Sequence, residues 1–123
     1  MPAVNLEVQR NGTKLPLRCS FSASAAFRMK GLLGRAELSR DDSILIKPCQ
    51  QIHMFFMKFA IDAVFLNADG NVSRIYHDIK PWKVSGYHPR ANAVWEMASG
   101  AAEYYQIEPG SSISFLKPSG ERL

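Results

Sequence analysis

The sequence predicts an α+β domain in which a mostly antiparallel β-sheet curls into a small barrel or half-barrel. Two observations support this prediction. Short apolar or alternating stretches recur along the chain, and Asn11-Gly12 and Asp69-Gly70 are dipeptides typical of two-residue hairpin turns. Since short connections join antiparallel strands, we expect most neighbouring stretches to pair in that way. Two segments with helix signals add one main helix and one short helix.

Length and composition predict one domain over residues 1–123. The chain is 46% hydrophobic and 21% charged, which suffices for one packed core, expected over about residues 4–117 with a polar tail at 118–123. No apolar run reaches the roughly 20 residues of a membrane span. The N-terminus lacks a basic segment followed by an apolar one, so we expect a cytoplasmic protein.

The first part of the chain predicts a hairpin and the main helix. Residues 4–10 alternate apolar and polar side chains, as in a half-buried strand. Residues 13–19 return as a second strand, which Pro16 makes an edge or bulged strand because proline has no N–H to donate. Residues 22–33 have helical apolar spacing, with a serine cap and Gly34 as the expected stop.

The middle of the chain holds its longest apolar run, residues 49–66. A short strand is predicted at 43–47 before it. The run fits both helical and strand periodicity, and its phenylalanines and isoleucines favour a strand, broken near 59–61. We then expect a hairpin of strands 63–67 and 72–79.

The last part predicts a long loop followed by three short elements. Residues 80–90 are rich in proline, glycine and aromatic residues and read as a loop. A strand at 93–98, a helix of one or two turns at 99–106 and a final strand at 113–116 complete the chain.

The two cysteines, Cys19 and Cys49, are expected to be reduced thiols. No Cys-x-x-Cys motif is present, so the sequence predicts neither a zinc site nor a redox site, and no metal or cofactor is expected. Cys49 and His53 are four residues apart. On the predicted strand they would lie about 13 Å apart, too far for one metal ion or a direct proton transfer.

Three blocks resemble the DUF192 family of small bacterial and archaeal domains of unknown function: residues 30–35 (KGLLGR), residues 52–70 (IHMFFMKFAIDAVFLNADG) and residues 94–100 (VWEMASG), with Gly110 after them. The resemblance covers about residues 17–117. It implies a mostly antiparallel β fold with short helices and no established enzyme activity. Ala60 stands where relatives often have proline, and residues 95–100 replace a common Leu-Glu-Leu-Pro-Ala-Gly.

Asp62 and Glu96 are the candidate catalytic carboxylates, with His53 as a third candidate. Each carboxylate lies in an apolar strand context and matches an acidic position of the family. A buried carboxylate must be paired or protonated, so we expect a Lys or Arg partner, or backbone N–H groups. Close together, two carboxylates could also catalyse hydrolysis of a glycosidic bond.

The loop 80–90 is the predicted ligand-binding segment. Aromatic rings beside cations can stack on a sugar while the cation binds an anion. We expect a cleft between this loop and the central run, unless Trp82 and Tyr87 instead plug one end of the barrel. The predicted ligand-binding residues are His53, Lys80, Trp82, Lys83, Tyr87, His88, Arg90 and Glu96.

Together these observations favour a non-enzymatic binding or accessory module. Its ligand would be carbohydrate-like, a small anion or a protein segment. The alternative is a small hydrolase-like enzyme that uses Asp62 or Glu96 with His53. A weak nucleic-acid binder is the third alternative, which the moderate net charge of +4 and the dispersed basic residues do not favour.

Overall fold

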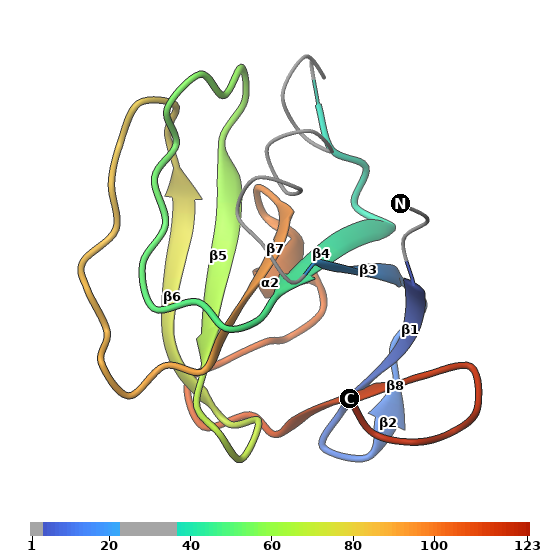
Figure 1. Cartoon of the computed structure of the whole chain (residues 1–123). Coiled ribbons are helices and arrows are strands. Elements are labelled where there is room, and N and C mark those ends of the chain that lie inside the picture. Colours follow the sequence, from blue (N-terminus) through green and yellow to red (C-terminus); the bar gives the residue numbers. More distant parts are fainter. Residues whose placement is uncertain (1–3, 23–36) are drawn as a thin grey trace.

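The computed structural model describes residues 4–22 and 37–123 (Figure 1). This part of the chain contains eight strands and one short helix. They are β1 (Val4–Arg10), β2 (Thr13–Lys14), β3 (Arg18–Ser22), β4 (Asp42–Ile46), β5 (Ile61–Leu66), β6 (Val72–Ile79), β7 (Ala93–Ala98), α2 (Ala101–Tyr104) and β8 (Ile113–Leu116).

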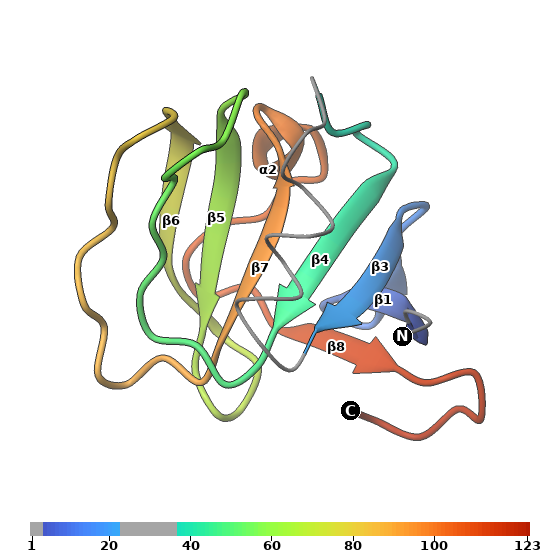
Figure 2. The same ribbon diagram turned by 45° about the horizontal axis from the view of Figure 1, so that its top comes forward.

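The strands form one sheet in the order β2-β1-β3-β4-β7-β5-β6, and β8 pairs with β1. The sheet curls into a half-barrel, because β1, β3 and β8 turn away from the plane of β4, β7, β5 and β6 (Figure 2). All pairs are antiparallel except β3 and β4, which run parallel. The sheet is therefore mixed, whereas the sequence favoured a mostly antiparallel sheet and did not predict the parallel β3–β4 pair.

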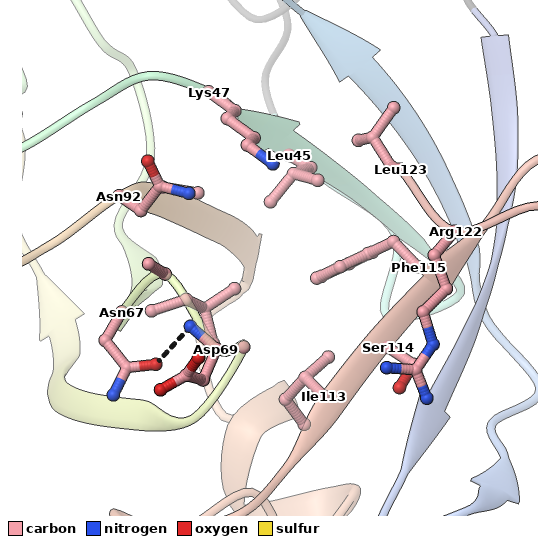
Figure 3. A pocket seen from close by; sticks show the side chains of 14 residues that line it. Leu45, Lys47, Asn67, Asp69, Asn92, Ile113, Ser114, Phe115, Arg122 and Leu123 are labelled. Carbon is pink, nitrogen blue, oxygen red and sulfur yellow. Dashed lines mark hydrogen bonds between the residues drawn. The ribbon is translucent and has the colours of Figure 1, made fainter.

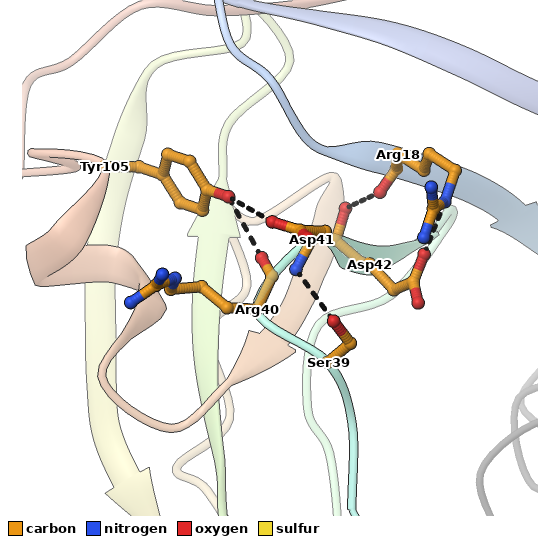
Figure 4. A network of polar contacts seen from close by, with 7 residues as sticks. Arg18, Ser39, Arg40, Asp41, Asp42 and Tyr105 are labelled. Atoms are coloured by element: carbon orange, nitrogen blue, oxygen red, sulfur yellow. Dashed lines mark hydrogen bonds and ion pairs between the residues drawn. The ribbon is translucent and has the colours of Figure 1, made fainter.

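A polar network holds together the beginnings of the parallel strands β3 and β4 (Figure 4). The Arg18 guanidinium donates to Asp42 Oδ1 at 2.8 Å, and this contact raises the pKa of Arg18. The Ser43 hydroxyl donates to the Arg18 carbonyl at 2.8 Å. The Tyr105 hydroxyl donates to the Arg40 carbonyl at 3.1 Å, and burial raises the pKa of Tyr105. The network ties the β3–β4 pair to the segment after α2.

Several predicted elements are confirmed and others are corrected. The predicted strand 113–116 agrees with β8, and the strands at 72–79 and 93–98 agree with β6 and β7. The predicted strand 13–19 is two strands, interrupted at Pro16, which has no N–H for the ladder. The short helix is confirmed only as the four residues of α2. The main helix predicted at 22–33 lies outside the described residues, apart from Ser22, which ends β3.

The strand predicted for the central run from residue 52 is wrong. Residues 49–60 contain no strand, only an isolated bridge between His53 and Val84. The segment instead pairs irregularly with residues 82–88. Met54 N donates to the Lys83 carbonyl at 2.7 Å, and Ser85 N donates to the Ile52 carbonyl at 2.9 Å. The two long loops therefore form one additional layer.

This layer explains why β5 is buried at every position. Val64 and Leu66 face the interior of the half-barrel, where the larger apolar cluster lies. Ala63 and Phe65 face the other side, where Ile52 from the loop layer joins a second cluster. Strands covered on both faces read as continuous apolar runs.

Asp62 connects three backbone segments through one carboxylate. It is 1% exposed, and β6 carries a bulge opposite it that places Asp78 at φ 54°. Asp78 N donates to Asp62 Oδ1 at 2.8 Å, while Gly100 N and Ala102 N each donate to Oδ2 at 3.0 Å. The partners of Asp62 are thus backbone N–H groups, the second of the two alternatives expected from the sequence, and not a Lys or Arg side chain.

The Asp62→Ala variant should have a free energy of unfolding that is lower by about 3–5 kcal/mol. The reason is that it loses several hydrogen bonds to a charged group, each of which contributes roughly 1.5–3 kcal/mol. Asp62→Asn should also destabilise, because its NH₂ group faces at least one N–H donor whichever way the amide lies. Urea unfolding measures both. Glu103→Gln, an exposed change in the same short helix, is the control; an unchanged Asp62→Asn midpoint would contradict the role assigned to this carboxylate.

Neither cysteine is in a disulfide; Cys19 is buried and Cys49 is half-buried. Burial in the larger apolar cluster raises the pKa of Cys19 from 9.0 to about 12. The Cys19 thiol is therefore protonated at neutral pH and cannot act as a nucleophile there.

The raised pKa of Cys19 predicts a loss of stability in alkali. Above pH 9 the unfolded chain releases the thiol proton while the folded chain keeps it until about pH 12, so unfolding becomes easier as the pH rises. Relative to Cys19→Ala, the wild type should lose about 1 kcal/mol per pH unit in this range. Urea midpoints of both proteins at about pH 8 and about pH 10.5 test this; parallel changes would refute it.

Candidate functional site

The structure does not bring the candidate carboxylates together. Asp62 lies opposite Met97 and faces the half-barrel interior and α2, as Val64 does. Glu96 lies between Ala63 and Ile44 on the other face of the sheet, and it is fully buried there. Because successive residues of a strand face opposite sides, the two carboxylates are separated by the sheet itself. They do not form an acid–base pair.

His53 belongs to the loop layer. Its ring stacks on Phe55 with centroids 4.6 Å apart, and its Nδ1 accepts a hydrogen bond from Phe55 N at 3.3 Å. Its bridge partner is Val84. The imidazole therefore lies among apolar side chains of the outer surface.

These side chains continue into a row that we call the aromatic strip: His53, Phe55, Phe56, Trp82 and Val84. Phe55 lies 6.0 Å from Trp82 between ring centroids, and Phe56 lies 4.9 Å from it, edge-on. Phe55 is 40% exposed, Phe56 62%, Trp82 59% and Val84 50%. Their neighbours Ile52, Met54 and Met57 point the other way, into the core.

Two residues of the aromatic strip hold an unusual backbone conformation. Phe56 has φ 65° and Trp82 has φ 70°, in the left-handed region that bulky side chains rarely occupy. Such conformations cost about 1–3 kcal/mol each and persist where the surrounding structure imposes them. At Trp82 the surrounding structure contributes a hydrogen bond, from Trp82 N to the Met54 carbonyl at 2.7 Å.

The remaining residues predicted from the loop divide into outward and inward groups. Tyr87 is 62% exposed, so neither Trp82 nor Tyr87 plugs the barrel. His88 turns inward, where its Nε2 lies 2.8 Å from the Tyr76 hydroxyl and its ring packs on Phe65. It therefore supports the loop from below and is not available at its outer surface.

The cations of the loop differ in their partners. Lys80 pairs with Asp78, and this contact, with a hydrogen bond from Ser99, lowers the pKa of the Asp78 carboxyl. Lys83 and Arg90 are exposed and form no ion pair with any described residue.

A cavity of about 140 Å³ lies elsewhere, at the open mouth of the half-barrel (Figure 3). None of the residues predicted to bind ligand line it. Five separate segments form its wall, so no local sequence pattern points to it. Its lining residues are Leu45, Lys47, Leu66, Asn67, Ala68, Asp69, Gly70, Asn92, Ala93, Ile113, Ser114, Phe115, Arg122 and Leu123.

Neither a metal-ligand cluster nor a membrane-spanning helix occurs in the described part of the chain. Within ranges 4–22 and 37–123, no three His, Cys, Asp or Glu side chains are grouped so that they could hold a metal ion. Among these same residues, no helix is long and apolar enough to cross a membrane.

Two solved structures share this fold. A protein of unknown function from Novosphingobium aromaticivorans DSM 12444 has a TM-score of 0.75 and 22% identity, over 90% of this chain and 84% of its own. A protein from Sinorhizobium meliloti 1021, described as "a putative transcription regulator", has a TM-score of 0.77 and 18% identity, over 94% of this chain and 96% of its own. Among curated protein sequences, none matches this chain.

The family profile described as DUF192, "Uncharacterized ACR", matches residues 6–115, which include every described strand but the start of β1 and the last residue of β8. The match agrees with the resemblance of the three sequence blocks. With most of its length covered by this profile, the chain belongs to the DUF192 family.

Proposed function

We propose that this protein is a non-enzymatic binding module whose aromatic strip contacts a partner protein. The observation that carries the proposal is that Trp82 is in ring contact with both Phe55 and Phe56, and yet the three side chains are 40–62% exposed. Single exposed apolar residues are ordinary, whereas contiguous ones mark interaction surfaces. Tryptophan and other large aromatic residues also contribute most strongly to binding at protein interfaces.

The ring geometry favours a protein segment over a sugar. Trp82 makes interplanar angles of 33° with Phe55 and 61° with Phe56, so the rings do not form a flat stacking platform. They form a ridge that would fit between side chains of a partner. The strained φ angles at Phe56 and Trp82 support a role for this ridge, since the chain keeps two bulky residues in a costly conformation at the surface.

The charge around the aromatic strip indicates the chemistry of the partner. Lys58, two residues after Phe56, and Lys83, next to Trp82, are exposed, and Lys83 has no described ion-pair partner. Charged rims select partners of opposite charge and accelerate association. The segment that fits best is therefore apolar with Asp or Glu residues beside it.

The opposed orientation of Asp62 and Glu96 speaks against the hydrolase alternative. Asp62 is occupied by three backbone N–H donors, and Glu96 lies on the other face of the sheet. A hydrolytic pair of carboxylates must flank one bond.

A peptide library selected on the wild-type protein tests the proposal. We expect enriched peptides to combine apolar residues with Asp or Glu. Their affinity should fall about tenfold or more in the Phe56→Ser/Trp82→Ser double variant, because both side chains are central anchors. Lys83→Glu should lower the affinity for acidic peptides, and the loss should be larger at low salt than at high salt.

Tyr104→Ser is the matched control, since Tyr104 is also an exposed aromatic residue, at 58%, but lies on α2 outside the strip. Peptides that bind the double variant as tightly as the wild type would overturn the proposal. If no peptides are enriched but the wild type binds on a glycan array and the double variant does not, the aromatic strip is assigned to a carbohydrate instead. Concentration-dependent sedimentation shows whether a second copy of the chain occupies it.

A further inference from the structure

The cavity at the mouth of the half-barrel combines an apolar floor with a polar rim. Leu45, Leu66, Ile113 and Phe115 supply apolar walls and belong to the larger core cluster or its strands. Lys47 reaches toward the cavity from the end of β4, and the Arg122 guanidinium stands at the other side next to Ser114 (Figure 3). An apolar pocket with a few converging polar groups is the usual form of a small-molecule site.

The rim presents hydrogen-bond donors that the protein does not use. Within the described part of the chain, Lys47 and Arg122 take part in no ion pair and their side chains in no hydrogen bond. Asn67 Oδ1 accepts hydrogen bonds from Asp69 N and Asn71 N, both at 3.0 Å, so its amide NH₂ group remains as a donor. The half-buried side chain of Asn92 also lines the cavity.

Charge and size restrict the ligand. Among the lining side chains, those of Lys47 and Arg122 carry two positive charges and that of Asp69 one negative charge, so these side chains have one positive charge in excess. The volume of about 140 Å³ is close to the roughly 150 Å³ of an apolar cavity that admits benzene. A monoanion with a small apolar body matches both properties.

We infer that this cavity binds a small organic monoanion, with its apolar body against Leu66, Ile113 and Phe115 and its anionic group at Lys47. The carboxylate of an aromatic or short aliphatic acid is the chemistry that fits, because it places one charge at one end of an apolar group. The site is separate from the aromatic strip: the two share no residue, and they lie against different apolar clusters.

NMR titration of the full chain with benzoate tests the inference, with hexanoate as the aliphatic probe. We expect saturable shifts of the backbone amides of Leu66, Gly70, Asn92, Ile113 and Phe115. Benzamide, which has the same body without the charge, should bind about tenfold more weakly. Phenyl phosphate distinguishes a carboxylate site from a general anion site. It carries a second negative charge, which exceeds the one positive charge in excess among the lining side chains.

Lys47→Met should weaken benzoate about tenfold or more, whereas Lys117→Met, an exposed lysine that does not line the cavity, should leave its affinity unchanged. Asn92→Leu provides a second variant that alters the rim without removing charge. Absence of saturable shifts with both acids would overturn the inference. So would equal affinity for benzoate and benzamide, or a Lys47→Met variant that binds benzoate like the wild type.

Discussion

The carboxylate of Asp62 is the contact on which the arrangement of the second half of the chain depends. A buried charge is costly, and here three backbone N–H groups offset that cost. The N–H of Asp78 is available because β6 bulges at this point, and the other two come from the start of α2. One side chain thus sets the end of the β5–β6 pair and the position of the turn that follows β7.

A second constraint arises from the sheet itself. β5 and β7 are buried on both faces, so a core inside the half-barrel is not enough to cover them. The two long loops meet this need by pairing with each other and inserting Ile52, Met54 and Met57 against the outer face. Because alternate residues of such a pair point in opposite directions, burial of Ile52 and Met54 turns Phe55 outward, and Val84 lies on the same outer side as its bridge partner His53. The aromatic strip is therefore a consequence of how the outer face is covered.

The same architecture separates the two surfaces with potential function. The aromatic strip lies on the loop layer and is built from neighbouring residues of two segments. The cavity lies at the mouth of the half-barrel, where β4, β8 and the turn between β5 and β6 meet. Protein binding at the first and small-anion binding at the second would use different residues, so each can be abolished without the other.

Much of the strand content follows from the sequence alone. The hairpin turns at Asn11-Gly12 and Asp69-Gly70 and the strands β6, β7 and β8 agree with local patterns of alternation and turn chemistry. The burial of Asp62 and Glu96 was also predictable from their positions in the chain. These features depend on residues within a few positions of one another.

Only the tertiary structure decided how those elements combine. The parallel pairing of β3 and β4 depends on which strands become neighbours, and local periodicity carries no information on that choice. The central run reads as a strand because it is rich in Phe and Ile, but it lies over β5, whose two edges are already paired with β6 and β7. Asp62 and Glu96 look equivalent in the sequence, and their different registers place them on opposite faces. The cavity is formed by five segments far apart in the chain, so it exists only once long-range packing has brought them together.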